Sequence, residues 1–126
     1  MQTASASSVE TESPWKEPAA LLAVMAHPAR LSILEALCET PRCVKDINAL
    51  VPLAQAQLSQ HMAALRKAKL VASHACGTLR CYYIVRPTLV KKLIPLLRRD
   101  HPLQQRDCRT ILRAAKRGRS SASTEG

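Results

Sequence analysis

The chain is poor in aromatic residues: among 126 residues there are two tyrosines, one tryptophan and no phenylalanine. Its core must therefore be aliphatic, and with roughly 85 residues left once the polar ends are set aside, dimerisation would help to bury it. No apolar run approaches the roughly 18 residues needed to span a bilayer. No Ser/His/Asp or Cys/His arrangement, glycine-rich phosphate loop or carboxylate pair stands out either. We therefore expect neither a membrane protein nor an enzyme.

Acidic residues are missing from a long central stretch, because none occurs between Asp46 and Asp100. The whole chain has 19 Lys and Arg against 9 Asp and Glu, a formal net charge of +10. The basic residues of the acid-free stretch are Arg66, Lys67, Lys69, Arg80, Arg86, Lys91, Lys92, Arg98 and Arg99. A surface of one sign attracts polyanions, so we expect double-stranded DNA as the partner, with a membrane surface as the weaker alternative.

Residues 43–86 follow the order of a helix-turn-helix and a wing. The expected segments are a short strand at Cys43 and Val44, a helix over 46–51, a corner at Pro52, a helix over 55–68, and strands over about 71–75 and 80–85 joined by a tip at Gly77 and Thr78. Small proteins read duplex DNA with this arrangement. The pattern predicts a mainly α fold with a small β-hairpin, a winged helix-turn-helix that forms a homodimer.

The run over residues 55–68 is amphipathic at helical spacing. The side expected to pack inward carries Leu58, His61, Met62, Leu65 and Lys69, and the opposite side carries Ala56, Gln57, Gln60, Ala63, Ala64 and Lys67. Short side chains on the second side would let the helix enter a major groove about 12 Å wide. An ordinary surface helix is the alternative interpretation. His61, at the edge of the apolar side, is expected to be a hydrogen-bonded boundary residue.

Two glutamines on the outward side are the candidate base readers. Gln57 and Gln60 can each pair bidentately with adenine, worth roughly 1–3 kcal/mol of discrimination. The remaining candidate DNA-binding residues are expected to contact the phosphate backbone or, on the wing, the minor groove: Gln55, Ser59, Arg66, Lys67, Thr78 and Arg80.

The chain divides into three parts: a disordered Ser/Thr-rich arm over 1–17, the winged helix-turn-helix over 18–98, and a basic C-terminal helix and tail over 99–126. Further helices are expected over 17–25, from Pro28 to about Thr40, from Pro87 with a kink or early end near Ile94 caused by Pro95, and from just beyond Pro102 to about Lys116. Leu103, Cys108, Ile111 and Ala115 would share one side of the last helix, and its basic side could bind phosphate or be a frayed tail. The candidate dimer residues are Leu21, Leu22, Leu89, Leu93 and Leu97.

Four segments together resemble the ArsR/SmtB-type winged-helix repressors: AHPARLSILEAL at 26–37, CVKDI at 43–47, QAQLSQHMAALRKAKLV at 55–71 and CYYI at 81–84. The resemblance covers about residues 18–97. It implies a homodimeric transcriptional repressor of a short pseudo-palindromic operator, with dimer contacts from the first and last helices of the domain, and an effector that releases it.

The metal sites that the resemblance would bring are missing from this sequence. Where metal-sensing members have Cys-Val-Cys, this chain has Cys43, Val44 and Lys45, and an ammonium cannot replace a thiolate ligand. The last dimer helix has no ligand set before Asp100 and His101. We therefore expect no required cofactor.

The five cysteines are expected to be reduced thiols in a cytoplasmic protein. Cys43, Cys38 and Cys81 are the candidate residues of a site for a thiol-reactive metal or metalloid effector, and Cys76 and Cys81 bracket the wing turn. Packing of small apolar cysteines is the alternative. Two rival functions also stay open: a thiol-based metal-binding protein, and a nonspecific nucleoid-type binder of nucleic acid.

Overall fold

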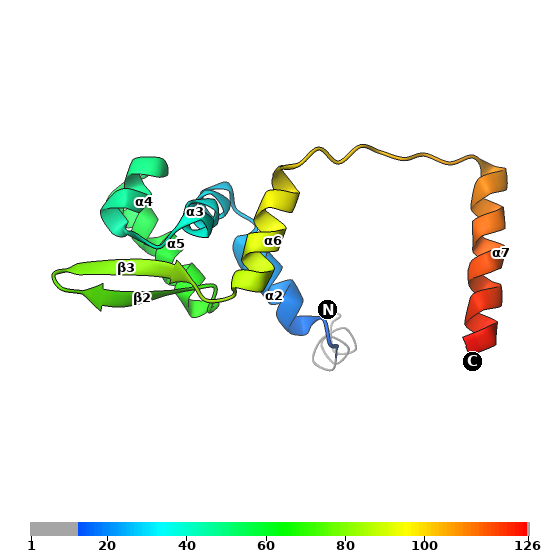
Figure 1. The fold of residues 1–126 in the computed structure, drawn as a ribbon, viewed down its shortest axis with the longest axis horizontal. Coiled ribbons are helices and arrows are strands. Elements are labelled where there is room, and N and C mark those ends of the chain that lie inside the picture. Colours follow the sequence, from blue (N-terminus) through cyan, green and yellow to red (C-terminus); the bar gives the residue numbers. More distant parts are fainter. Residues whose placement is uncertain (1–12, 126) are drawn as a thin grey trace, which may run out of the picture.

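The computed structural model describes residues 13–125, and side chains over 13–118. Its elements are α2 (Lys16–Met25), α3 (Pro28–Glu39), β1 (Arg42–Cys43), α4 (Val44–Leu50), α5 (Gln55–Lys67), β2 (Val71–Cys76), β3 (Leu79–Ile84), α6 (Pro87–Arg98) and α7 (Cys108–Glu125). The predicted fold class is confirmed: the chain is mainly helical, and its small antiparallel sheet includes the β2–β3 hairpin that projects from one edge of the body (Figure 1). Of the predicted arm, residues 1–12 lie outside the described residues, and residues 16 and 17 belong to α2.

The sheet has three strands in the order β1-β3-β2, both pairs antiparallel. The wing hairpin pairs Val71 with Ile84 at its base and Cys76 with Leu79 at its tip. Gly77 has a φ of 65°, a left-handed conformation that glycine adopts without steric cost, and this lets the hairpin turn. Strand β1 adds to the other edge of β3, as expected for Cys43, while Val44 already begins α4.

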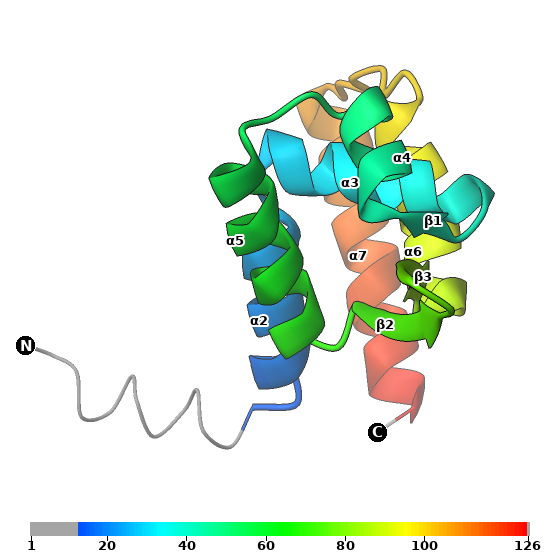
Figure 2. The same cartoon turned by 90° about the vertical axis from the view of Figure 1, so that its left-hand side faces the viewer.

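The core is aliphatic, as the composition predicts. The fully buried large side chains are Ile33, Leu34, Leu37, Ile47, Leu58, Leu65, Leu70, Val71 and Val90. Helix α3 runs through the middle of the body, packing against α5, α6 and β3, while α2 lies alongside α5 (Figure 2). Of the two wing tyrosines, Tyr82 joins the core and Tyr83 is exposed on the other face of the hairpin.

The C-terminal part differs from the prediction. Residues 99–107 contain no helix, so Leu103 lies outside α7, and the helix runs beyond Lys116 to Glu125. Asp107 explains the later start, because its carboxylate accepts a hydrogen bond from the Thr110 backbone N–H at 2.8 Å, a helix-capping contact. In Figure 1, α7 stands apart from the body.

Helix α6 does not end at Ile94. It continues through Pro95 to Arg98, so the expected early end is wrong. No single helix among residues 13–125 is long and apolar enough to cross a membrane; α2 and α3 reach that length and composition only as a pair bent by 95°.

Candidate DNA-binding surface

Helices α4 and α5 are joined by a short turn that one side chain holds. The Asn48 amide oxygen accepts a hydrogen bond from the Leu53 backbone N–H at 3.1 Å, which fixes the chain just before α5 begins. At the start of α5, Ala54 has no side-chain capping bond. The first backbone N–H groups of this helix therefore have no capping side chain and are available to an anion.

The inner face of α5 is largely as predicted. Leu58, Met62 and Leu65 are buried, and His61 is half-buried at the boundary. Lys69 was expected on this side, and that expectation is wrong: α5 ends at Lys67, Lys69 has a φ of 59° and is exposed, and Leu70 enters the core in its place. The left-handed turn at Lys69 redirects the chain from the helix into the wing.

An arginine and two histidines seat α5 against the rest of the domain. The Arg30 Nε donates to His61 Nδ1 at 3.1 Å, and the Arg30 Nη1 donates to the Val24 carbonyl at 3.0 Å. The His61 ring lies 4.4 Å from the ring of His27, whose own Nδ1 accepts the Ala29 N–H at the start of α3. Desolvation lowers the pKa of His61, and His27 and Arg30 lower it further. His61 therefore has the boundary role predicted for it, although its pairing with His27 was not foreseen.

The outer face of α5 is open to solvent. All eight predicted DNA-binding residues are exposed: Gln55, Gln57, Ser59, Gln60, Arg66, Lys67, Thr78 and Arg80. The first six lie on α5, while Thr78 and Arg80 lie at the wing tip. On the wing, the Arg80 guanidinium donates to the Ser73 hydroxyl at 3.0 Å, a bond that connects β3 to β2.

This surface keeps its positive charge. Among residues 13–118, ion pairs form between Arg42 and Glu39 at 2.6 Å and between Arg98 and Glu35 at 3.0 Å, and neither pair includes a residue of α5, β2 or β3. Arg86 donates to the Lys69 carbonyl at 3.0 Å, which adds a charge near the end of α5. No ion pair among residues 13–118 joins a cation of α5, β2 or β3 to an acidic side chain, although Glu17 of α2 lies near Lys67 and Arg86.

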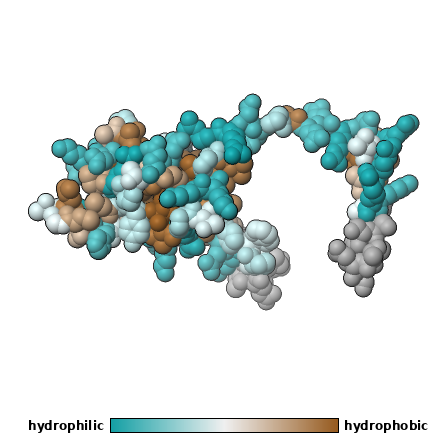
Figure 3. Space-filling view, viewed as in Figure 1, coloured by the Kyte–Doolittle hydropathy of each residue, from teal (hydrophilic) through white to brown (hydrophobic). Residues whose placement is uncertain are grey.

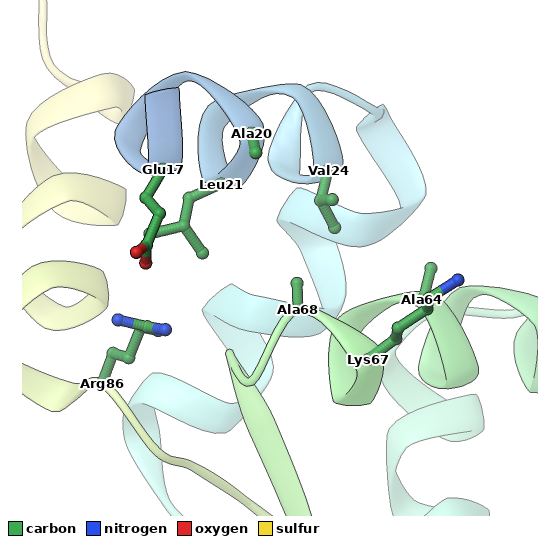
Figure 4. Close-up of a pocket in the computed structure, with 8 residues that line it drawn as sticks. All are labelled: Glu17, Ala20, Leu21, Val24, Ala64, Lys67, Ala68 and Arg86. Carbon is green, nitrogen blue, oxygen red and sulfur yellow. The ribbon is translucent and has the colours of Figure 1, made fainter. Parts of the chain in front are cut away.

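A cavity of about 410 Å³ lies behind the end of α5, between α2, α5 and the start of α6. Its floor is formed by small and aliphatic side chains, including Ala64 and Val24, and Glu17 and Arg86 point toward each other across it (Figure 4). Helix α2 and the end of α5 thus face each other across this cavity partly through the alanines Ala20, Ala64 and Ala68.

Comparisons with known proteins agree with this geometry. Residues 27–73 match the family described as "Bacterial regulatory protein, arsR family". The uncharacterized HTH-type transcriptional regulator Rv0081 of Mycobacterium tuberculosis is 36% identical over 86 residues, covering 68% of this chain and 75% of that protein. The chain belongs to the ArsR family.

Solved structures with the same fold superpose on the chain. HlyU from Vibrio cholerae has a TM-score of 0.62 with 34% identity, covering 68% of this chain and 92% of that one. Rv0081 has a TM-score of 0.61 with 30% identity, covering 86% and 99%. PagR of Bacillus anthracis, titled a transcriptional repressor, has a TM-score of 0.59 with 34% identity, covering 65% and 93%.

The candidate thiols of this ArsR-family chain are only partly brought together. Cys43 of β1 lies directly opposite Cys81 of β3. Cys38 instead packs between α3 and α6, where its Sγ lies 3.9 Å from the Val90 carbonyl oxygen and burial raises its pKa. The predicted set of Cys43, Cys38 and Cys81 is therefore not one cluster. Among the described residues, no three His, Cys, Asp or Glu side chains are placed to hold a metal ion.

The candidate dimer leucines differ in how far they are exposed. Leu21 and Leu93 pack at the edge of the core, whereas Leu22, Leu89 and Leu97 are exposed. Leu96, beside Leu97, is exposed as well and was not among the predicted residues. In Figure 3, hydrophobic residues gather over the middle of the body, while the part of α7 that is drawn in colour is mainly hydrophilic.

Proposed function

We propose that this ArsR-family chain is a cytoplasmic, homodimeric repressor that binds a pseudo-palindromic DNA operator and needs no cofactor to do so. One observation carries the proposal: the outer face of α5 presents two exposed glutamines among small residues, beside α5 and wing cations that form no ion pair among the described residues. This face has the shape and the charge that a major groove requires.

Sequence reading is assigned to Gln57 and Gln60. Both are exposed, and a glutamine amide can hydrogen-bond adenine through N6 and N7 at once. The bond from the Leu53 N–H to Asn48 holds the turn before α5, and the bond from Arg30 to His61 holds the middle of α5, so the glutamines are presented in a set orientation. Arg66, Lys67 and Arg80 supply positive charge that contacts phosphates without choosing a sequence.

Dimerisation is assigned to the exposed leucines of α2 and α6. A twofold dimer doubles the reading helix and separates its copies by about one helical turn of DNA, which makes the operator pseudo-palindromic. The solution structure of Mb0332 from Mycobacterium bovis, titled a homodimeric winged helix-turn-helix domain, has the same fold with a TM-score of 0.59. A dimer seated across a promoter would block transcription, which is the repressor role named for PagR.

The test is selection of bound duplexes from a random DNA pool at about 150 mM salt, where nonspecific phosphate binding is already weakened. We expect a consensus with two related half-sites about one helical turn apart. Enrichment without a consensus would contradict the proposal and favour a nonspecific binder. Truncation after Asp100 removes α7 and most of the segment that precedes it, and distinguishes an operator reader from a nonspecific binder. The operator reader keeps its consensus, whereas a binder that relies on the basic tail loses its affinity.

A further inference from the structure

The outer face of the wing sheet gathers three of the five cysteines. Cys81 is central on β3, with Cys43 of β1 directly opposite on one side and His74 of β2 directly opposite on the other. Cys76 is two residues beyond His74, so its side chain emerges on the same face, diagonal to Cys81. Strand pairing therefore gives Cys81 a thiol neighbour on each side.

The two thiols nearest the tip are diagonal neighbours on one face of the hairpin. The nearby Cys76 side chain is the largest cause that raises the pKa of Cys81, followed by partial burial and the charges of Cys76, Cys43 and Asp46. Cys76 is exposed, whereas Cys81 is half-buried. In a reactive cysteine with a resolving partner, an exposed thiol meets the oxidant and a neighbouring thiol completes the disulfide. Cys76 would take the first role and Cys81 the second.

We propose that Cys76 and Cys81 form a reversible disulfide across the wing when the protein meets a two-electron oxidant of the peroxide class. The Cys76 thiolate attacks one peroxide oxygen, the O–O bond breaks, and the sulfur becomes a sulfenic acid while the other oxygen leaves as water after protonation. The Cys81 sulfur, losing its proton, then attacks the sulfenic sulfur and expels the second water. In sum, two thiols and one hydrogen peroxide give one disulfide and two water molecules.

The same thiols are poorly suited to a metal ion. Among the described residues, no three metal-ligating side chains are placed to hold a metal ion. A pair of thiols is better suited to forming a disulfide. Cys76 is the better partner for Cys81 because it adjoins the turn at Gly77, where the hairpin can adjust. Cys43 is held by strand pairing and directly precedes helix α4.

The bond would change the shape of the wing tip. Diagonal neighbours in an antiparallel pair are about 7–8 Å apart, beyond the Cα separation of most disulfides, so the hairpin must twist when the bond closes. Thr78 and Arg80 lie between the two cysteines in sequence and must move with them. This second step rests on the proposed function, because it matters only if the wing contacts DNA.

The chemical test counts thiols and maps the linkage. Treatment with hydrogen peroxide should lower the number of free thiols from five to three in the wild-type protein, and from four to two in Cys108→Ser, a matched control that removes the exposed cysteine of α7. Trypsin cuts after Arg80, so the bond should join peptides 70–80 and 81–91. Dithiothreitol should separate them, and Cys76→Ser should not form the link.

Other linkages would overturn the assignment. A bond joining peptide 43–45 to 81–91 would make Cys43 the partner instead, and no linked peptide at all would refute the dithiol. Arsenite protection of Cys43, Cys76 and Cys81 together from alkylation, without a peroxide-induced link, would point to a soft-ion site in its place.

The regulatory test uses the selected operator. Oxidation should weaken wild-type binding about tenfold, with recovery on reduction, and should leave Cys76→Ser unchanged. An unchanged wild-type affinity despite a mapped Cys76–Cys81 bond would refute the coupling to DNA. If no operator is found, the thiol count and peptide map still decide the chemistry, so failure of the proposed function is told apart from failure of the disulfide.

Discussion

Replacing Leu97 by alanine should weaken the dimer without unfolding the protomer. Leu97 is 50% exposed on α6, so within one protomer it has half of its surface still to bury. Full burial of a leucine side chain is worth roughly 1.5–3 kcal/mol, which leaves about 1 kcal/mol to be gained at an interface. Because a twofold dimer contains the residue twice, the substitution should cost about 2 kcal/mol of association free energy, or roughly a thirtyfold rise in the dimer Kd.

Sedimentation equilibrium over a range of protein concentrations measures this change directly. Leu103→Ala is the matched control, since Leu103 is 88% exposed in the segment between α6 and α7 and the same atoms are removed. Circular dichroism should show both variants folded. An unchanged dimer Kd in Leu97→Ala, or an equal loss in Leu103→Ala, would refute the assignment of the α6 face to the interface.

Three further predictions concern the reading unit. Gln60→Ala should relax sequence preference in the duplex selection, and an unchanged preference would contradict the base-reading role of Gln60. Arg80→Ala should instead weaken binding to all duplexes alike and lower the salt dependence of binding by about one phosphate per protomer. Asn48→Ala should lower the free energy of unfolding in urea by about 1–3 kcal/mol, because the half-buried Leu53 N–H loses its acceptor, while Asn48→Asp keeps an oxygen there and should lose less. Because the pKa of His61 is lowered in the folded protein, the unfolded chain takes up a proton at a higher pH, near the usual value of about 6.5. The free energy of unfolding of the wild type should therefore fall as pH drops below that value, and His61→Gln should show a shallower fall. Identical pH profiles for the two proteins would contradict this role of His61.

Local signals predicted most of the helices. Proline at the first helical position marks the starts of α3 and α6 at Pro28 and Pro87, and the apolar spacing of α5 identifies Leu58, Met62 and Leu65 as buried. These signals act over one or two helical turns, so they can be read without tertiary information. The signal for the late start of α7 was also local, since Asp107 is a capping residue. The spacing of apolar residues from Leu103 onward favoured an earlier start instead.

Contacts between distant segments could not be predicted in the same way. The bond between Arg30 and His61 joins residues 31 positions apart, and the pairing of Cys43 with Cys81 requires the register of β1 on β3. Sequence spacing placed Cys38 with these thiols because it is near Cys43 in the chain, but the end of α3 directs it toward α6 instead. The exposed DNA-binding candidates were accessible to sequence reasoning, because a solvent-facing side chain needs only the correct helix phase.

The excess of positive charge that the acid-free stretch of sequence gives α5, the wing and α6 has a consequence for how the protein responds to salt. Like charges on the two copies repel, and dissolved salt screens that repulsion, whereas binding to DNA depends on releasing counterions and weakens as salt rises. Assembly and operator binding thus respond to ionic strength in opposite directions. Because only the dimer holds both half-sites, occupancy of the operator at a fixed, low protein concentration should pass through a maximum at intermediate salt, and the cell's ionic composition becomes an input to repression alongside the concentration of the protein itself.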